Sequence, residues 1–239
     1  MHYIYALFVT AMKHMYLLLL STFLVTAAFS QESVQFNLRD FDKIEISSAF
    51  IAEISQGATY RIEVSIPEGT KDKLKVEKEG NELDVSFKGS KGSSGQHKIK
   101  IQLPELKSLE VSGASSVTLS EFQGQRLDAE VSGASTLQGK LSYNNMEMEV
   151  SGASSIKLEG TVNSAKLYLS GASNLGSATF SVKGDLVLDL SGASNATLTA
   201  DGDMYLQLSG ASTFSYSGVG NVLKQEVTGA SHVEKLGGE

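Results

Sequence analysis

The sequence predicts an all-β fold, a single-stranded parallel β-helix (β-solenoid) with about seven coils. The tetrapeptide SGAS begins at Ser112, Ser132, Ser151, Ser170, Ser191 and Ser209, and a TGAS copy begins at Thr228. These copies lie 18 to 21 residues apart, a period that suits one solenoid coil and is too short for a propeller blade or a pair of helices. Apolar residues alternate with polar ones on both sides of each copy, which indicates strands.

The tetrapeptide is explained if every coil bends at the same place. Glycine allows the positive φ or the close backbone approach that such a bend requires. We therefore expect one structural corner in each coil, at Gly113, Gly133, Gly152, Gly171, Gly192, Gly210 and Gly229. Alternation counted back from Val117 and Leu119 points the column that begins at Ser115 inward, with hydroxyls bonding along the stack, and the Ser112 column outward.

Residues 31–108 differ from the repeat. They lack SGAS, although Ser47-Ser48-Ala49-Phe50 stands where a degenerate copy would fall. Alternating runs predict longer strands, Glu79-Gly80-Asn81 a turn between two of them, residues 68–73 one helical turn and residues 89–95 a flexible loop. We predict one continuous domain over residues 31–239, in which 31–108 forms wider coils that cap the apolar end of the 109–239 repeat.

Residues 1–30 are predicted to be a secretory signal peptide. Tyr16–Phe29 is an apolar run too short to span a bilayer comfortably, Lys13 precedes it, and Ala28-Phe29-Ser30 resembles a cleavage site. The alternative is an uncleaved signal anchor. No second apolar run could span a membrane, so we expect an exported protein in the periplasm, at the cell surface or outside the cell.

Composition excludes several classes of function. The chain has no Cys, which removes disulfides, thiolate metal sites and cysteine nucleophiles. Its net charge of −7 argues against nucleic acid as a partner, because phosphate neutralisation needs excess Lys and Arg. There is no G-x-S-x-G elbow, phosphate-binding loop or zinc-ligand spacing. Seven equivalent serines indicate architecture, so we predict no catalytic residues and no cofactor.

Several segments together carry a family resemblance. FDKIEISSAFIAEISQG, LKVEKEGNELDVSFKG, IKIQLPELKSLEVSGASSV and the SGAS repeats resemble the putative auto-transporter adhesin, head GIN domain family, which is common in exported proteins of Bacteroidetes-type bacteria. The resemblance covers about residues 33–235. It implies a right-handed parallel β-helix with an adhesin-like role, and it brings no catalytic residues.

Two sets of side chains are candidates for binding. Stacked coils would gather Asp128, Glu130, Glu147 and Glu149 into one acidic patch. Ca²⁺ would relieve their repulsion, whereas the alternative is a solvated acidic face screened by salt. Outward aromatics that could stack on sugar rings or fill partner pockets are expected at Tyr143, Tyr168 and Tyr205, the alternative being scattered surface tyrosines.

These observations favour an exported, non-enzymatic, adhesin-like binding protein of the bacterial envelope that presents a rigid repetitive surface to a glycan or protein. One alternative is a polysaccharide-active β-helix enzyme using Glu130 or Glu149, and another is a structural or stress-related periplasmic protein without an external ligand. A homo-oligomer also fits, because Glu234 and Lys235 alone discourage end-to-end stacking of the last coil.

Overall fold

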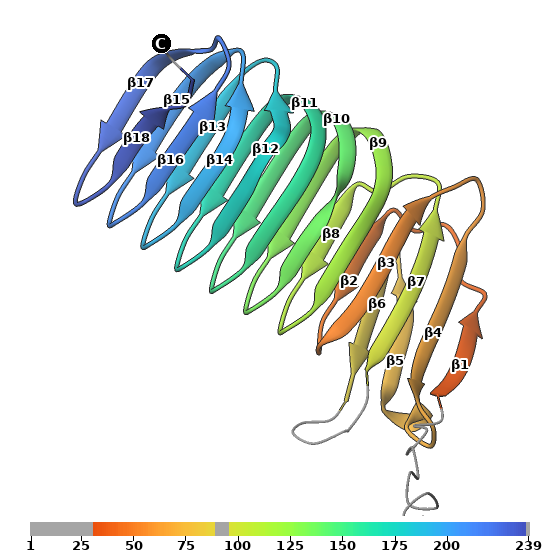
Figure 1. The fold of residues 1–239 in the computed structure, drawn as a ribbon. Coiled ribbons are helices and arrows are strands. Elements are labelled where there is room, and N and C mark those ends of the chain that lie inside the picture. The colour runs from red at the N-terminus through yellow and green to blue at the C-terminus, as the bar shows by residue number, and fades with distance from the viewer. Residues whose placement is uncertain (1–30, 89–95, 238–239) are drawn as a thin grey trace, which may run out of the picture. The chain divides into compact units, whose positions relative to one another are not determined.

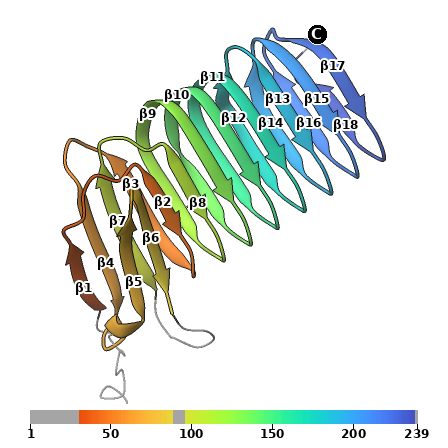
Figure 2. The ribbon, with the colours of Figure 1, turned by 180° about the vertical axis from the view of Figure 1, so that it is seen from behind.

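The computed structural model describes residues 31–88 and 96–237. They form stacked β coils (Figures 1 and 2), and the solenoid of about seven turns confirms the predicted fold class. The predicted signal peptide and the predicted loop at residues 89–95 lie outside the described residues. Within residues 31–88 and 96–237, no helix is long and apolar enough to cross a membrane.

Each coil has two faces that meet at the SGAS corner. The back face contains β6 (Glu82–Phe87) and the strands that precede a corner, β2 (Lys43–Ile46), β8 (Ser108–Val111), β13 (Leu186–Leu190), β15 (Asp203–Leu208) and β17 (Asn221–Val227). The front face contains β7 (His97–Leu103) and the strands that follow a corner, β3 (Phe50–Gln56), β12 (Asn174–Val182), β14 (Asn195–Ala200), β16 (Thr213–Ser217) and β18 (His232–Lys235). Three long strands run through both faces, β9 (Ser116–Val131), β10 (Thr136–Val150) and β11 (Ser155–Leu169).

Alternation along these strands builds the core. Successive coils pair in parallel and in register, so that Leu127 lies beside Met146 and Val131 beside Val150. Residues at these inward positions are almost fully buried, and Val131 has an exposed fraction of 0%. The parallel pairing therefore stacks similar side chains of successive strands, about 4.8 Å apart, into columns. Each coil covers the apolar interior of the coil before it.

The seven corner glycines all adopt the left-handed conformation, with φ between +71° and +79°. At Gly152 the packing also excludes a side chain, in addition to the dihedral angle. A Cβ added there would lie 2.3 Å from the carbonyl oxygen of Gly133 in the preceding coil. That same carbonyl accepts a hydrogen bond of 2.8 Å from the backbone N–H of Ala153. The corner thus requires glycine both for its φ and for the close stacking of the coils.

The last serine of each SGAS copy points inward, as predicted, and Ser154 has an exposed fraction of 2%. Its hydroxyl does not bond along the stack, however. Ser154 Oγ donates to the backbone carbonyl of Ser151, three residues earlier in the same corner, at 2.9 Å. Equivalent bonds form at Ser115, Ser173, Ser194 and Ser212. Only in the TGAS copy does the expected contact along the stack form among the described residues, where Ser231 Oγ accepts from the backbone N–H of Ser212 at 3.2 Å. The bend brings the carbonyl of Ser151 within hydrogen-bond distance of Ser154 Oγ in the same coil, whereas the serine hydroxyl of the next coil is a full strand spacing away. Ser135 is the exception, because its Oγ has no hydrogen-bond partner among the described residues.

The residues that make some coils longer than others lie at a distance from the SGAS corner. Leu119 pairs with Gly139 and Phe122 with Leu141, so β9 contains one more residue than β10 between these pairs. Glu121 occupies this bulge with a φ of +49°. Further register shifts lie between Ile156 and Gly160, and between Gly176 and Ser181. The corner therefore stays in register from coil to coil while other parts of the coil take up the insertions.

The degenerate corner at Ser47–Phe50 is confirmed. Ile46 pairs with Val111 and Ile51 with Ser116, which places Ser48 beside Gly113. Ser48 adopts a φ of +68°, like the glycine it replaces. The coil formed by β2 and β3 thus lies directly against the first SGAS coil.

The expectation that residues 31–108 form wider coils of the same solenoid is wrong for their antiparallel strands, although β2 and β3 stack in parallel on β6 and β7. β1 (Gln31–Phe36) pairs antiparallel with β4 (Arg61–Pro67), β4 pairs antiparallel with β7, and β5 (Leu74–Glu79) pairs antiparallel with β6. The coil of β2 and β3 also lies between β6–β7 and β8–β9, out of chain order. β5 and β6 form a hairpin, whereas β1 and β4 extend the sheet of β7. Phe36 and Leu74 from these strands pack against the core at this end. The predicted turn at Gly80 and a 3₁₀ turn, η1 (Lys71–Lys73), are both present.

Candidate binding surface

Five carboxylates lie in one outward column on the back face, which we call the acidic ladder. Asp84 on β6 pairs with Glu45 on β2, and Glu45 pairs with Glu110 on β8. Glu110 pairs with Glu130 on β9, which pairs with Glu149 on β10. Neighbouring strands are about 4.8 Å apart, so carboxylates of like charge face one another on five successive strands.

The sequence pattern missed the first two members of the ladder. Asp84 and Glu45 precede the repeat, and chain order hides the fact that β2 lies between β6 and β8. The degenerate corner was the signal that could have found Glu45, because it stands two residues before Ser47 just as Glu110 stands two residues before Ser112.

Partial burial and repulsion from neighbouring carboxylates disfavour the charged forms of Glu45 and Glu110. Burial raises the pKa of Glu110, and the neighbouring Glu45 and Glu130 raise it further. Burial likewise raises the pKa of Glu45, with added repulsion from Asp84. Asp84 has a cationic neighbour, since Lys75 Nζ donates to its carboxylate. Among the described residues, no ion pair within 4.0 Å neutralises Glu45, Glu110, Glu130 or Glu149.

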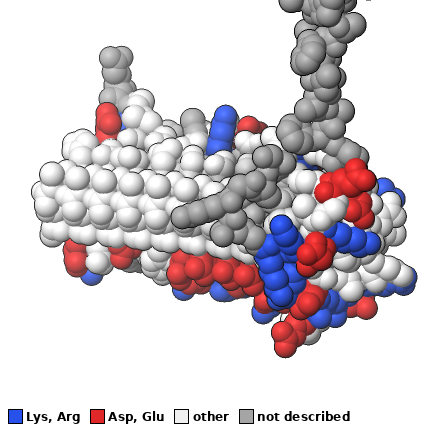
Figure 3. Space-filling model, turned by 90° about the horizontal axis from the view of Figure 1, so that it is seen from below, with Lys and Arg blue, Asp and Glu red and all other residues white. Residues whose placement is uncertain are grey.

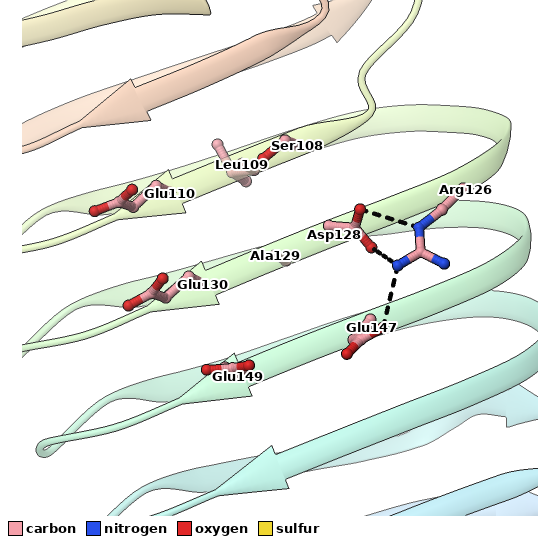
Figure 4. Close-up of a pocket in the computed structure, with 9 residues that line it drawn as sticks. All are labelled: Ser108, Leu109, Glu110, Arg126, Asp128, Ala129, Glu130, Glu147 and Glu149. Atoms are coloured by element: carbon pink, nitrogen blue, oxygen red, sulfur yellow. Dashed lines mark hydrogen bonds and ion pairs between the residues drawn. The ribbon is translucent and has the colours of Figure 1, made fainter.

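The adjacent outward column is neutralised by arginine (Figure 4). Arg126 Nη2 lies 2.7 Å from Asp128 Oδ1 and 3.1 Å from Glu147 Oε2. Lys166 Nζ lies 4.0 Å from the same Glu147 oxygen. The guanidinium therefore bridges two neighbouring coils, and Asp128 and Glu147 are not free to share a cation with Glu130 and Glu149.

The structure places the four proposed Ca²⁺ ligands in two different environments. Of the four carboxylates proposed to share the ion, Asp128 and Glu147 are engaged by Arg126, while Glu130 and Glu149 are exposed. Across residues 31–88 and 96–237, no three His, Asp or Glu side chains form a group that could hold a metal ion. Ca²⁺ prefers six to eight oxygen ligands, and this surface does not gather them.

An open groove continues the ladder along the back face, and we call it the Tyr168 groove. It is lined by Glu130, Glu149, Tyr168 and Asp189 on one side and by Ser151, Ser170 and Ser191 on the other. Tyr168 is half-buried and lies between Glu149 and Asp189 in the same outward column. Tyr205 lies two coils further on, in the neighbouring column, with an exposed fraction of 42%. The groove combines an aromatic ring, carboxylates and hydroxyls on a rigid support.

Tyr143 does not belong to this surface, and its prediction as an outward aromatic is wrong. Its exposed fraction is 3%, and its hydroxyl donates to the backbone carbonyl of Leu106 at 2.9 Å. Gly124 lies beside it in the neighbouring coil, and a Cβ on Gly124 would lie 2.6 Å from the Tyr143 ring. The missing side chain makes room for the ring inside the coil.

The SGAS edge itself is uncharged. Figure 3 views it from below, as rows of white residues with acidic side chains along one border. Each corner exposes its glycine and alanine, whereas the serine that follows them is buried in SGAS copies such as Gly133-Ala134-Ser135. The corner is therefore a structural edge, and the chemically varied side chains lie on the faces beside it.

The fold and its surface define a class of protein, a β-solenoid with an open groove along one face. The family comparison is more specific. The family described as putative auto-transporter adhesin, head GIN domain, matches residues 40–220, and the chain belongs to that family. No curated protein matches the chain in sequence.

Solved structures from Bacteroidetes share the fold. A putative adhesin from Bacteroides fragilis superposes with a TM-score of 0.76 at 19% identity, covering 87% of this chain and 97% of that one. A putative lipid binding protein from Parabacteroides distasonis gives 0.68 at 18% identity, covering 87% and 98%. A putative adhesin from Parabacteroides merdae gives 0.65 at 19% identity, covering 87% and 97%. At such low identity these likenesses concern the fold alone.

Proposed function

We propose that the protein is an exported, non-enzymatic, adhesin-like binding protein of the bacterial envelope that holds a glycan along its back face. The Tyr168 groove is the observation that carries this proposal. Family membership supports an adhesin-like role, and the groove supplies the chemistry.

Each component of the groove fits part of a sugar. An aromatic ring offers a flat apolar surface to the C–H face of a sugar ring. The carboxylates of Glu149 and Asp189 accept hydrogen bonds from sugar hydroxyls, and the hydroxyls of Ser151 and Ser170 can both donate and accept. Because the coils repeat, similar groups recur at each strand spacing, which favours several weak contacts along one chain of sugars.

A panel of bacterial and host glycans and matrix proteins tests the proposal. The wild-type protein is expected to bind at least one glycan, and Tyr168→Ala and Glu149→Gln are expected to weaken that binding. Gln138→Ala is the matched control, because Gln138 is exposed on the front face. Binding to proteins alone, or to glycans with no effect of the groove variants, would contradict the proposal.

The enzyme alternative has its own test. Glu130 and Glu149 lie beside each other on one open surface, whereas glycoside hydrolysis uses two carboxyl groups with separate roles and environments. We expect no new reducing ends when polysaccharides are incubated with the protein. Reducing ends that disappear in Glu130→Gln or Glu149→Gln would show catalysis.

Location separates adhesion from a structural role in the periplasm. Protease is added to intact cells, to lysed cells and to spent medium. Digestion on intact cells, or recovery from the medium, is expected of a protein that meets external partners. Protection until lysis would favour the structural or stress-related alternative.

A further inference from the structure

The last coil leaves an apolar surface at the C-terminal end of the solenoid, which we call the end surface. Seven large hydrophobic residues are exposed among the described residues, and five of them lie in this coil. The end surface consists of Val219, Val222, Leu223, Val227 and Leu236, whose exposed fractions run from 36% to 79%.

These side chains are exposed because no further coil covers them within residues 31–88 and 96–237. Val222 pairs with Met204 and Val227 with Leu208, and both partners are buried in the core. Val222 and Val227 therefore occupy inward positions of the solenoid. At the opposite end the antiparallel strands cover the core, and Phe36, Leu38, Leu74 and Val76 are partly buried against it.

The backbone at the C-terminal end is open as well. Among residues 31–88 and 96–237, β17 pairs with β15 alone and β18 with β16 alone. Each strand thus has one edge of unpaired N–H and C=O groups, which is a template for another strand. On β18 an inward-pointing charge opposes pairing with another strand. Lys235 occupies an inward register position, and its Nζ lies 5.8 Å from the centroid of the Tyr216 ring. β17 is therefore the more receptive edge.

The sequence of β17 is complementary to itself when one copy is reversed. In an antiparallel pair of two β17 strands centred on Gln225, Lys224 lies opposite the partner's Glu226, and Glu226 lies opposite the partner's Lys224. The same register places Leu223 opposite the partner's Val227. Lys224 and Glu226 now pair with each other along the strand at 2.8 Å, and both remain more than half exposed. Opposite charges directly across an antiparallel pair stabilise it.

We propose that two copies of the protein associate head to head through the end surface, with β17 of each copy pairing antiparallel to β17 of the other. The contact is isologous, as a two-fold dimer requires. It covers the apolar residues and completes the open edge. Because β17 belongs to the back face, the pairing joins the back faces of both copies into one sheet, so their Tyr168 grooves face the same side.

Sedimentation velocity over micromolar to millimolar concentration tests the dimer. The wild-type protein is expected to show a reversible monomer–dimer equilibrium. Lys224→Glu and Glu226→Lys each place like charges opposite one another at both ends of the register, and each is expected to raise the dimer dissociation constant roughly tenfold or more. Lys140→Glu is the matched control, because Lys140 is exposed and paired with Glu121 away from the end surface.

A mixture of the two variants distinguishes this register from a folding defect. One copy then carries two acids at positions 224 and 226 and the other carries two bases, so the mixture is expected to form a 1:1 heterodimer while each variant alone is monomeric. The double variant Lys224→Glu/Glu226→Lys restores complementarity and is expected to dimerise like the wild type. A wild-type monomer at every concentration, or a mixture that stays monomeric, would overturn the proposal. So would a dimer that all these changes leave intact, because its contact would lie elsewhere.

Discussion

Replacing Gly152 with alanine should cost far more stability than the same replacement at Gly69. Both glycines have nearly the same left-handed backbone, with φ of +73° at Gly152 and +74° at Gly69. They differ in their surroundings. Among the described residues, a Cβ on Gly69 would have no atom within 4 Å, whereas one on Gly152 would lie 2.3 Å from Gly133 O. The pair therefore separates the cost of the dihedral angle from the cost of the stacked corner.

The magnitude follows from the distances. An L-residue in the left-handed region costs about 1 kcal/mol, and this is the whole expected cost of Gly69→Ala. At Gly152 the coils must separate by 3.4 − 2.3 = 1.1 Å to reach ordinary contact. That movement breaks the 2.8 Å hydrogen bond from Ala153 N–H to Gly133 O and loosens the packing beneath it. The lost bond and the loosened packing add about 2 kcal/mol, so Gly152→Ala should cost about 3 kcal/mol.

Urea unfolding followed by circular dichroism measures both variants against the wild type. The slope of the transition must be compared too, because repeat proteins can lose cooperativity. A difference between the two variants of less than about 0.5 kcal/mol, which is typical of an exposed site, would refute the stacked-corner reasoning.

Three further outcomes are expected. Burial lowers the pKa of His97, so below about pH 6.5 the unfolded chain takes up a proton that the folded protein does not. The free energy of unfolding should therefore fall as the pH falls through this range, and urea titrations of His97→Phe should lack that part of the fall. Because burial and nearby carboxylates raise the pKa of Glu110, the folded state disfavours its charge, and thermal melts should show Glu110→Gln to be more stable than the wild type at neutral pH and low salt. This gain in stability should shrink in high salt, and it should disappear in acid, where the wild-type carboxylate is protonated in both states. Tyr143→Phe removes the donor to Leu106 O and should cost about 1 kcal/mol in urea unfolding, whereas Tyr205→Phe, at an exposed ring, should change little.

The repeat was enough to predict the solenoid, and the reasons are local. Gly at the same place in each coil requires a shared bend, and alternation around it sets which side chains face inward. The inward direction of Ser154 follows from that alternation. Its hydrogen-bond partner does not, because the path of the chain through the bend decides whether a neighbouring coil or the same coil supplies the acceptor.

The surface was harder to predict because it depends on which strands become neighbours. The repeat itself orders Glu110, Glu130 and Glu149, but only the insertion of β2 between β6 and β8 extends the ladder to Asp84 and Glu45. Tyr143 was misjudged for a related reason. Its burial depends on Gly124 in the adjacent coil, which the sequence separates from it by 19 residues.

The hydroxyl of Ser154 closes onto the carbonyl of its own coil, and this has a consequence for the history of the gene. A coil whose corner satisfies its buried hydroxyl internally brings no unmet polar group when it is copied next to itself, nor does it leave one behind when it is lost. Duplication or deletion of a 19-residue unit, such as the one from Ser151 to Leu169, therefore preserves the corner chemistry on either side. Unequal recombination between these similar coding segments can lengthen or shorten the solenoid one coil at a time while the polypeptide stays foldable at each step.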